Sequence, residues 1–327
     1  MTTKSISLAA FSALMGGTAI ADVPNVAVDI APVHSLVARV MKGVGHPELI
    51  LPSSASPHGY SMRPSEAQAL QDADVVVWMG ADLAPWMEGA VETLAEDAAV
   101  LMLLEADKTT LLEFRENALF EKHAHGADDD HEDHHHEHVE DHDDDHRKSH
   151  DEHAHVHSQH DPHAWLSPAN AATWLDLIAA ELASKDPEHA EAYLANAAAG
   201  RDELAALTAE VSATLAPVRG GSFIVFHDAF QYFETDFGFP ASGAISLGDA
   251  EDPSPARLSQ IKKRVQNEGV DCVLAEPQFN PGLVAAVTEG TEVQTGVIDP
   301  LGANLEPGAA LYPQLIRNIA STLTDCM

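Results

Sequence analysis

The sequence predicts an α/β protein of two lobes, each with a mainly parallel sheet, joined by one long rigid helix. Short apolar segments alternate with helical segments in both halves of the chain, which is the pattern of doubly wound parallel sheets. A single proline-free helical segment separates the two halves. The chain length of 327 residues allows two domains of ordinary size, each able to bury its own core.

The N-terminal lobe is expected over residues 22–186, and its strands are short apolar runs bounded by turn residues. Its second helix begins at Pro64, because proline is tolerated in a first turn and the acidic side chain of Glu66 suits the helix dipole. The predicted strands are 25–30, 48–51, 74–78 and 99–104, and the predicted helices are 33–41, the segment from 64, 83–94 and 168–184.

A linker helix is expected over residues 187–216, followed by a C-terminal lobe over 217–327. The run from Glu188 to Leu215 contains no proline and one glycine, Gly200. A helix of about 29 residues is roughly 43 Å long, which is enough to span both lobes. The second lobe is predicted to have strands at 222–227, 271–275 and 292–298 and helices at 254–268, 281–289 and 311–322.

The first 21 residues have the order of a secretory signal peptide. A basic start at Lys4 precedes an uncharged run of small and apolar residues, which ends in Ala19-Ile20-Ala21. The apolar run is short for a membrane span, and no later segment approaches the ~20 apolar residues that a span requires. With no cysteine near the cleavage point, we expect a soluble protein outside the cytoplasm; the alternative is a frayed cytosolic N-terminus.

The formal net charge of −35 excludes two classes of partner. Nucleic acids and anionic membrane surfaces require a basic surface patch, and this acidic chain repels both. The same charge attracts cations. The sequence therefore predicts no nucleic-acid partner and favours a cationic ligand.

A tract from Glu121 to His160 consists almost entirely of His, Asp and Glu. Such a composition offers metal ligands but cannot bury a core. We expect it to act as a secondary metal loop, a low-affinity zinc collector or sensor, because ordering a flexible chain opposes tight coordination. The alternative is an acidic spacer. The candidate ligands are His123, His125, His131, His134, His135, His136, His138, His142, His146, His150, His153, His155, His157 and His160.

Three other histidines and one aspartate lie where strands appear to end. They are His58, His163, His227 and Asp299. Ligands bind at the carboxyl ends of strands in open α/β sheets, although a single strand-end histidine is more often an ordinary hydrogen-bonded residue. Three imidazoles with one carboxylate or water form a tetrahedral set that suits zinc, whereas manganese prefers more oxygen ligands.

The two cysteines, Cys272 and Cys326, lack the paired spacing of a structural zinc site. An oxidising compartment favours a disulfide between them. Two buried free thiols are the alternative.

Five segments around these residues, in order and together, resemble one family: the periplasmic metal-binding components of ABC-type zinc and manganese importers, the cluster A-I solute-binding proteins, especially their Znu-type zinc subgroup. The resemblance covers essentially the whole mature chain. The segments are Pro57-His58-Gly59-Tyr60-Ser61-Met62-Arg63-Pro64-Ser65-Glu66, Asp161-Pro162-His163-Ala164-Trp165-Leu166, Phe226-His227-Asp228-Ala229-Phe230, Ala275-Glu276-Pro277-Gln278 and Asp299-Pro300-Leu301-Gly302.

The resemblance implies two (β/α) lobes with the metal in the cleft between them. It implies ligands His58 and His163 from the N-terminal lobe, and His227 and Asp299 from the C-terminal lobe. Manganese-binding relatives carry glutamate at the position of His227, so this histidine indicates zinc. In such proteins the carboxylate can yield to water or a nearby glutamate, and Asp299 can instead orient a histidine. The zinc members also have a His-rich insertion and a C-terminal disulfide.

The function expected from these observations is a monomeric periplasmic solute-binding protein that captures Zn²⁺ with high affinity and delivers it to an inner-membrane ABC permease. A periplasmic zinc chaperone is a further candidate partner. Zinc would be the transported ligand, and no catalytic residue is expected because no Gly-x-Ser-x-Gly motif is present and no general base is evident beside the predicted site. The alternatives are an extracytoplasmic zinc buffer, storage or adhesion protein, or a manganese-binding relative.

The affinity for zinc should weaken as the pH is lowered through the histidine range near ~6.5, because each imidazole must be neutral to bind metal.

Overall fold

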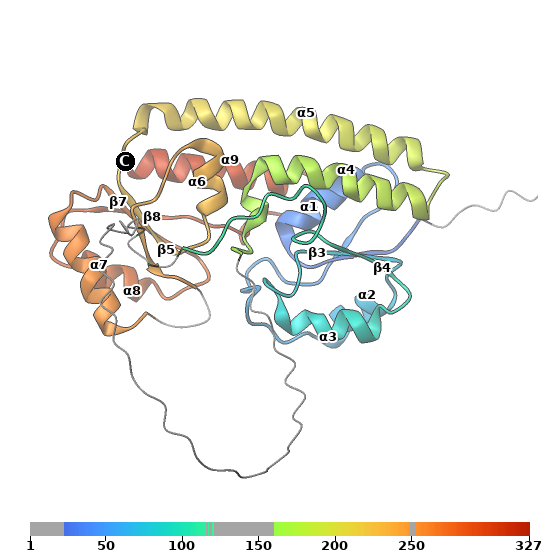
Figure 1. Cartoon of the computed structure of the whole chain (residues 1–327), viewed down its shortest axis with the longest axis horizontal. Helices are drawn as coiled ribbons and strands as arrows, with labels where there is room; N and C mark the ends of the chain where they lie inside the picture. The colour runs from blue at the N-terminus through green and yellow to red at the C-terminus, as the bar shows by residue number, and fades with distance from the viewer. Residues whose placement is uncertain (1–22, 116, 118–119, 121–159, 249–252) are drawn as a thin grey trace, which may run out of the picture.

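The computed structural model describes residues 23–115, 117, 120, 160–248 and 253–327. The predicted signal peptide and every histidine of the tract except His160 lie outside the described residues. In the described chain, two four-stranded parallel sheets lie side by side, each with its own helices, beneath a long helix that spans both (Figure 1). The predicted two-lobed α/β fold is confirmed.

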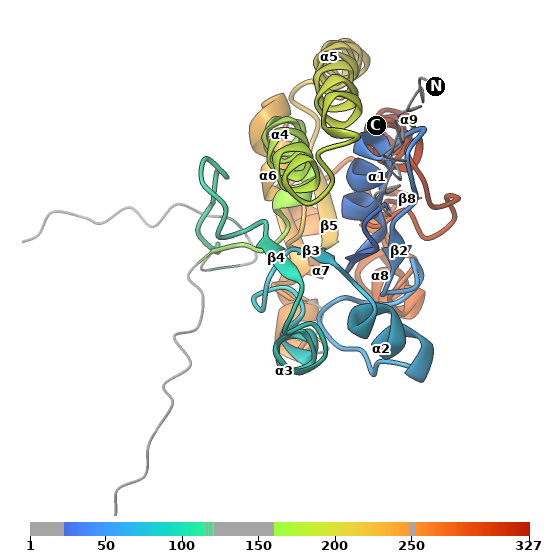
Figure 2. The same ribbon diagram turned by 90° about the vertical axis from the view of Figure 1, so that its right-hand side faces the viewer.

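The first sheet has the order β2-β1-β3-β4, with all neighbouring strands parallel. A helix connects each strand to the next, as parallel pairing requires. The strands are β1 (Val26–Val28), β2 (Glu48–Leu49), β3 (Val75–Trp78) and β4 (Ala99–Met102), and the connecting helices are α1 (Ala31–Val40), α2 (Pro64–Gln71) and α3 (Pro85–Leu94). In the orthogonal view, α2 and α3 lie at the end of the molecule opposite α5 (Figure 2).

The second sheet repeats this topology in the order β6-β5-β7-β8. Its strands are β5 (Phe223–His227), β6 (Gly243–Ser246), β7 (Cys272–Ala275) and β8 (Gln294–Val297), and its helices are α6 (Gln231–Phe237), α7 (Pro255–Asn267), α8 (Pro281–Thr288) and α9 (Leu311–Cys326). In each sheet, the strands are added toward one edge in the first part of the lobe and toward the other edge in the second part. The order therefore reverses between the two central strands, β1 and β3 in the first sheet and β5 and β7 in the second. This reversal is where α/β sheets form ligand sites.

Between β5 and α7 the structure contains two elements that the sequence did not predict, α6 and β6. Both are short, and the chain between them turns at Gly238, whose φ of 58° is in the left-handed region that favours glycine. A helix of 7 residues and a strand of 4 residues give too few periods for a hydrophobic pattern to be recognised. Two short 3₁₀ helices, η1 (Ala164–Leu166) and η2 (Ala216–Val218), complete the described elements.

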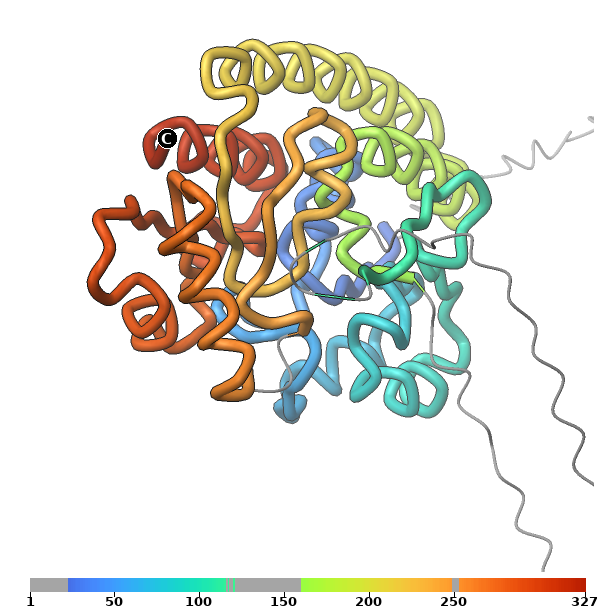
Figure 3. The backbone as a smooth tube through the Cα atoms, turned by 60° about the vertical axis from the view of Figure 1, so that its left-hand side comes forward, coloured from blue at the N-terminus to red at the C-terminus, as the bar shows by residue number. Residues whose placement is uncertain are grey.

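The long helix α5 (Ala190–Leu215) contains 26 residues, which at 1.5 Å per residue is roughly 39 Å. It begins slightly later than predicted because the buried carboxylate of Asp186 accepts hydrogen bonds from the backbone N–H and the ring of His189, which hold these residues in a turn. Helix α5 packs against α1, α4 (Pro168–Lys185) and α9. Figure 3 shows it arching over both α4 and α9.

Strand alternation divides the core into layers. On one face of the sheets, a single continuous core lies beneath α1, α4, α5 and α9. It contains residues of both lobes, such as Val26 and Val77 of the first and Val225 and Leu274 of the second. On the opposite faces each lobe has a separate cluster, under α2 and α3 in the first and under α7 and α8 in the second. A core shared between the lobes resists their separation, because opening it would expose apolar surface to water.

Cys272 and Cys326 form a disulfide with a Cα–Cα distance of 5.7 Å, as predicted. The bond joins the first residue of β7 to the last residue of α9. It therefore fixes the C-terminal helix to the centre of the second sheet. None of the helices in the described ranges combines the length and the apolar composition needed to cross a membrane.

The shared core leads to a prediction about motion. We expect zinc binding to change the radius of gyration by less than about 1 Å, as in preorganised complexes, because α5 and the common core join the lobes. Small-angle scattering with zinc and with chelator would measure this on a variant in which residues 121–159 are replaced by a short Gly-Ser linker. A compaction of several ångströms would contradict a rigid connection between the lobes.

Candidate metal centre

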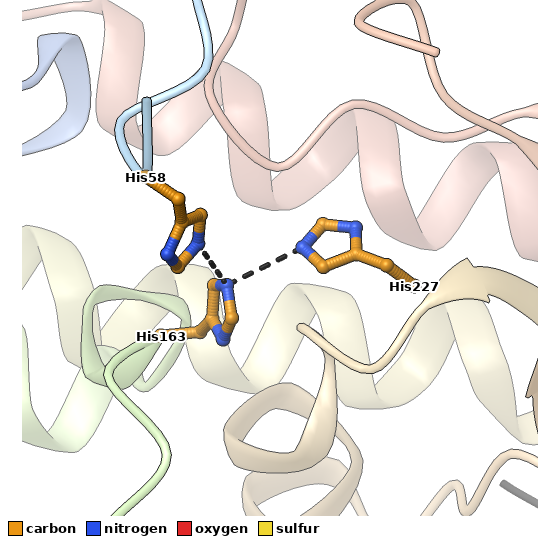
Figure 4. Close-up of side chains that lie close together, drawn as sticks. All are labelled: His58, His163 and His227. Atoms are coloured by element: carbon orange, nitrogen blue, oxygen red, sulfur yellow. Dashed lines mark hydrogen bonds between the residues drawn. The ribbon is translucent and has the colours of Figure 1, made fainter. Parts of the chain in front are cut away.

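Three histidines from distant parts of the sequence meet between the lobes. His58 lies in the loop between β2 and α2, His163 lies just before η1, and His227 is the last residue of β5. Figure 4 shows their rings pointing toward one another. The Nε2 atom of His163 lies 3.2 Å from that of His58 and 3.3 Å from that of His227. Among the described residues, these three histidines form a group whose ligand atoms lie close enough together to hold a metal ion.

The spacing of these nitrogens matches zinc. A tetrahedral zinc ion with Zn–N bonds of about 2.0–2.1 Å keeps its ligand nitrogens about 3.3 Å apart. The ligand atoms of all three histidines lie within 4.8 Å of one another, so only a small adjustment is needed to surround one ion. Two of the three nitrogen–nitrogen distances already have the value expected for tetrahedral zinc.

A buried carboxylate orients His163. Asp161 Oδ1 accepts hydrogen bonds from the backbone N–H of His163 at 3.0 Å and from its Nδ1 at 2.6 Å, and both side chains are almost inaccessible to solvent. An imidazole that donates from Nδ1 has its lone pair on Nε2, directed at the centre. Burial raises the pKa of Asp161 to about 7, while the N–H of His163 and the charge of Arg115 act to lower it.

His227 is oriented in the same way by Glu276. Glu276 Oε1 accepts from the backbone N–H of His227 at 3.0 Å and from its Nδ1 at 2.7 Å. These residues are far apart in the sequence but adjacent in the sheet, because β5 ends at His227 and its neighbour β7 ends just before Glu276. The central strand pair of the second lobe therefore builds one ligand together with its orienting carboxylate.

His58 is held by its loop. The ring N–H of Trp86 donates to the carbonyl of Pro57 at 2.7 Å, and the hydroxyl of Tyr60 donates to Glu66 of α2 at 2.8 Å. The rings of Tyr60 and Trp86 also meet edge to face. His58 is half-buried, whereas His163 and His227 are each 4% exposed. Of the three candidate ligands, His58 is thus the one most open to solvent.

The walls of the pocket are neutral and largely apolar apart from Glu276, and they come from both lobes. The lining residues besides the three histidines are Ser56, Pro57, Trp165, Glu276, Gln278, Phe279, Pro300 and Leu301. Such walls limit access of water to the site and strengthen the electrostatic interactions within it.

Asp299 is not brought together with the histidines. Its carboxylate accepts hydrogen bonds from the backbone N–H groups of Leu301, Gly302 and Ala303 at 3.0, 3.0 and 2.6 Å, and it lines a neighbouring groove. These bonds order the turn that contains Pro300, whose carbonyl accepts from the ring N–H of Trp165 at 2.8 Å. The structure thus places Asp299 behind the wall of the pocket.

Asp161 and Glu276 are the functional residues to which sequence reasoning gave no role. The Asp-Pro-His spacing of residues 161–163 contained a local signal for the first, since an aspartate two residues before a histidine can accept its backbone N–H. Glu276 had no local signal, because its partner lies 49 residues away and only strand pairing connects them.

The orienting role of Asp161 and Glu276 can be tested by substitution. Replacing either one, as in Glu276→Gln or Asp161→Asn, should weaken zinc binding by about 10- to 100-fold, the usual effect of losing an outer hydrogen bond to a ligating histidine. Competition with a chelator of known affinity would measure the change. Glu289→Gln is the matched control, because Glu289 is an exposed glutamate that pairs with Lys262. Affinities within threefold of wild type for both site variants would refute an orienting role.

Comparison with known proteins agrees with this geometry. Residues 26–326 match the family described as Zinc-uptake complex component A periplasmic. The chain is 44% identical over 305 residues to the high-affinity zinc uptake system protein ZnuA of Brucella abortus (strain 2308), covering 93% of this chain and 91% of that protein. It is 41% identical over 325 residues to the protein of that name in Paracoccus denitrificans (strain Pd 1222), covering 99% and 98%.

The fold agrees as well. A solved crystal structure of ZnuA superposes with a TM-score of 0.71 at 21% identity, covering 93% of this chain and 99% of that one. The matched range covers nearly all the described residues and contains the three histidines and the two carboxylates that contact them. The chain therefore belongs to the family of periplasmic zinc-uptake complex components A, which are solute-binding proteins of transport systems and not enzymes.

Proposed function

We propose that this chain captures Zn²⁺ through the Nε2 atoms of His58, His163 and His227 and delivers it to an inner-membrane ABC permease. The observation that carries the proposal is the convergence of these atoms at the spacing of a tetrahedral ion. The lone pairs of His163 and His227 already face the centre, because buried carboxylates engage their Nδ1 atoms. Little reorganisation then opposes binding, which favours high affinity.

The ligand set favours zinc over manganese. All three ligand atoms are imidazole nitrogens, while manganese sites are rich in oxygen. Asp299 would have to turn away from the backbone N–H groups of its own turn to contribute an oxygen, and each buried group left unsatisfied would cost about 1–3 kcal/mol. We propose that Asp299 organises the turn behind the pocket and that the fourth zinc position is occupied by solvent or by another small ligand from the cleft.

Delivery requires a state that binds zinc less well. Two ligands belong to the first lobe and one to the second, so a small relative movement of the lobes separates the Nε2 atoms. The loop that carries His58 offers a second route, because His58 is the most exposed of the three ligands. We propose that docking to the permease favours such a state, and that the protein acts as a soluble periplasmic monomer after removal of residues 1–21.

We also propose that the histidine-rich tract collects zinc weakly beside the site or senses high zinc concentrations. The support is its position in the chain. Its last residue, His160, bridges to Glu113, and the next residue, Asp161, orients His163. The tract therefore ends one residue before the orienting carboxylate of the metal centre.

A zinc buffer or adhesin would use the same site without a permease. Measurement of zinc uptake distinguishes a transport component from a buffer or an adhesin. If the protein serves transport, cells that lack it should lose high-affinity zinc uptake and grow poorly in zinc-poor medium. Normal uptake and growth without it would indicate a buffer or an adhesin.

The ligand assignment can be tested by calorimetry with zinc and with manganese. Wild type and a variant with residues 121–159 replaced by a short linker should share one tight zinc site, and the linker variant should lose the additional weak sites. His227→Glu should weaken zinc binding by at least about 100-fold, because it replaces a nitrogen ligand and leaves Glu276 facing a second carboxylate.

Asp299→Asn serves as the contrasting variant, because an amide oxygen can still accept from the backbone turn. Its zinc affinity should stay within about tenfold of wild type, roughly 1.4 kcal/mol. Loss of the tight site on removal of the tract, or equal losses in His227→Glu and Asp299→Asn, would contradict the assignment.

A further inference from the structure

The chain segment that leads into the histidine-rich tract crosses from one lobe to the other. We call residues 109–115 the root segment. On the first lobe, the backbone of Thr110 exchanges two hydrogen bonds with the side chain of Asn170 in α4, at 2.8 and 3.0 Å. The ring N–H of Trp174 donates to the hydroxyl of Thr109 at 2.9 Å. In Figure 1 the segment runs, in teal, from the first lobe toward β5.

At its far end the root segment contacts the second lobe and the chain segment that carries Asp161. The N–H of Leu112 donates to the hydroxyl of Tyr232 in α6 at 3.0 Å, and that hydroxyl donates to the carbonyl of Asp161 at 2.7 Å. The N–H of Asp161 in turn donates to the carbonyl of Leu112 at 2.8 Å. Three hydrogen bonds thus form a closed ring among the root segment, α6 and the residue that orients His163.

Arg115, at the end of the root segment, is paired with two carboxylates of the second lobe. Its Nε lies 3.0 Å from both oxygens of Asp228, and Nη1 and Nη2 lie 2.8 and 3.0 Å from the oxygens of Glu234. The ring of Phe120 covers the guanidinium, 3.5 Å from its central carbon. The side chain of Arg115 is 18% exposed and the two carboxylates 5% each.

These charges lie close to the candidate ligands. Asp228 follows His227, and Asp161 precedes His163 by two residues. Arg115 therefore compensates two buried carboxylates, Asp228 and Glu234, beside the metal centre. Removing the arginine would leave these carboxylates without their cation, and uncompensated buried charges are strongly destabilising.

We propose that Arg115 is a positioning residue for the metal centre: its pairing with Asp228 and Glu234 holds the lobes at the separation in which the three histidines converge, and so sets the lifetime of bound zinc. The inference rests on the proposed zinc-capture function and deepens it. The hydrogen bonds of Arg115 described above go to Asp228 and Glu234 and not to the histidines. Arg115 acts through Asp228 on the end of β5 and through the root segment on the chain segment that carries Asp161 and His163.

The test is the dissociation rate of zinc, followed by stopped-flow mixing of the zinc-loaded protein with excess chelator. Arg115→Met should release zinc at least about tenfold faster, because removing one partner of a buried ion pair leaves the other partner uncompensated. Arg317→Met is the matched control. Arg317 also binds a glutamate in bidentate fashion, but on the surface between α9 and α5, and its loss should leave the rate within about twofold of wild type.

A double-mutant cycle separates charge pairing from packing. In an Asp228→Asn/Glu234→Gln background the carboxylates are neutral, so Arg115→Met should change the rate by less than about twofold. Thermal unfolding would verify that each variant folds. If Arg115→Met does not fold, Arg115→Lys, which keeps the charge but loses the bidentate geometry, should show intermediate acceleration.

An unchanged release rate in the folded single variant, or an effect that persists in the neutral background, would overturn the role of Arg115. Failure of the wild-type protein to bind zinc tightly would instead overturn the proposed function on which the inference rests.

Discussion

The geometry of the candidate metal centre depends on the hydrogen bonds that two buried carboxylates accept from histidine rings. Asp161 and Glu276 each accept from the backbone N–H and the Nδ1 atom of one histidine. This double contact fixes the orientation and the tautomer of the ring, so that Nε2 lone pairs face one point. Converging lone pairs repel each other until a cation lies between them. A metal ion is therefore the natural partner of this arrangement, and the carboxylates stabilise the positive charge it brings.

The rest of the fold serves this convergence. The switch point of the second sheet places His227 beside Glu276, and the root segment places Asp161 against α6. Helix α5 and the shared core keep the lobes close enough for His163 to reach both His58 and His227. In our proposal, zinc affinity and release are controlled at the lobe interface, where the shared core supplies stiffness and the buried charges around Arg115 supply a polar contact that can be broken.

Much of this was accessible from the sequence. Alternating apolar segments predicted both sheets, and the three predicted histidines are the ones that the structure brings together. Only His227 ends a strand, whereas His58 lies in a loop and His163 lies just before η1. Asp299 was grouped with them because it too follows a strand, but β8 is an edge strand separated from β5 by β7, so its carboxyl end lies away from the switch point. Glu276 and Arg115 were not assigned because their partners are distant in the sequence. Such pairings depend on strand order and lobe packing, which residue spacing does not encode.

The most direct measurement of the central claim is a crystal structure of the zinc-loaded protein with anomalous scattering recorded at the zinc absorption edge. The account predicts one strong peak about 2.0–2.1 Å from the Nε2 atoms of His58, His163 and His227, with the Nδ1 atoms of His163 and His227 still bonded to Asp161 and Glu276. A strong peak bound by Asp299, or one held by Nδ1 atoms with the carboxylate contacts broken, would contradict it.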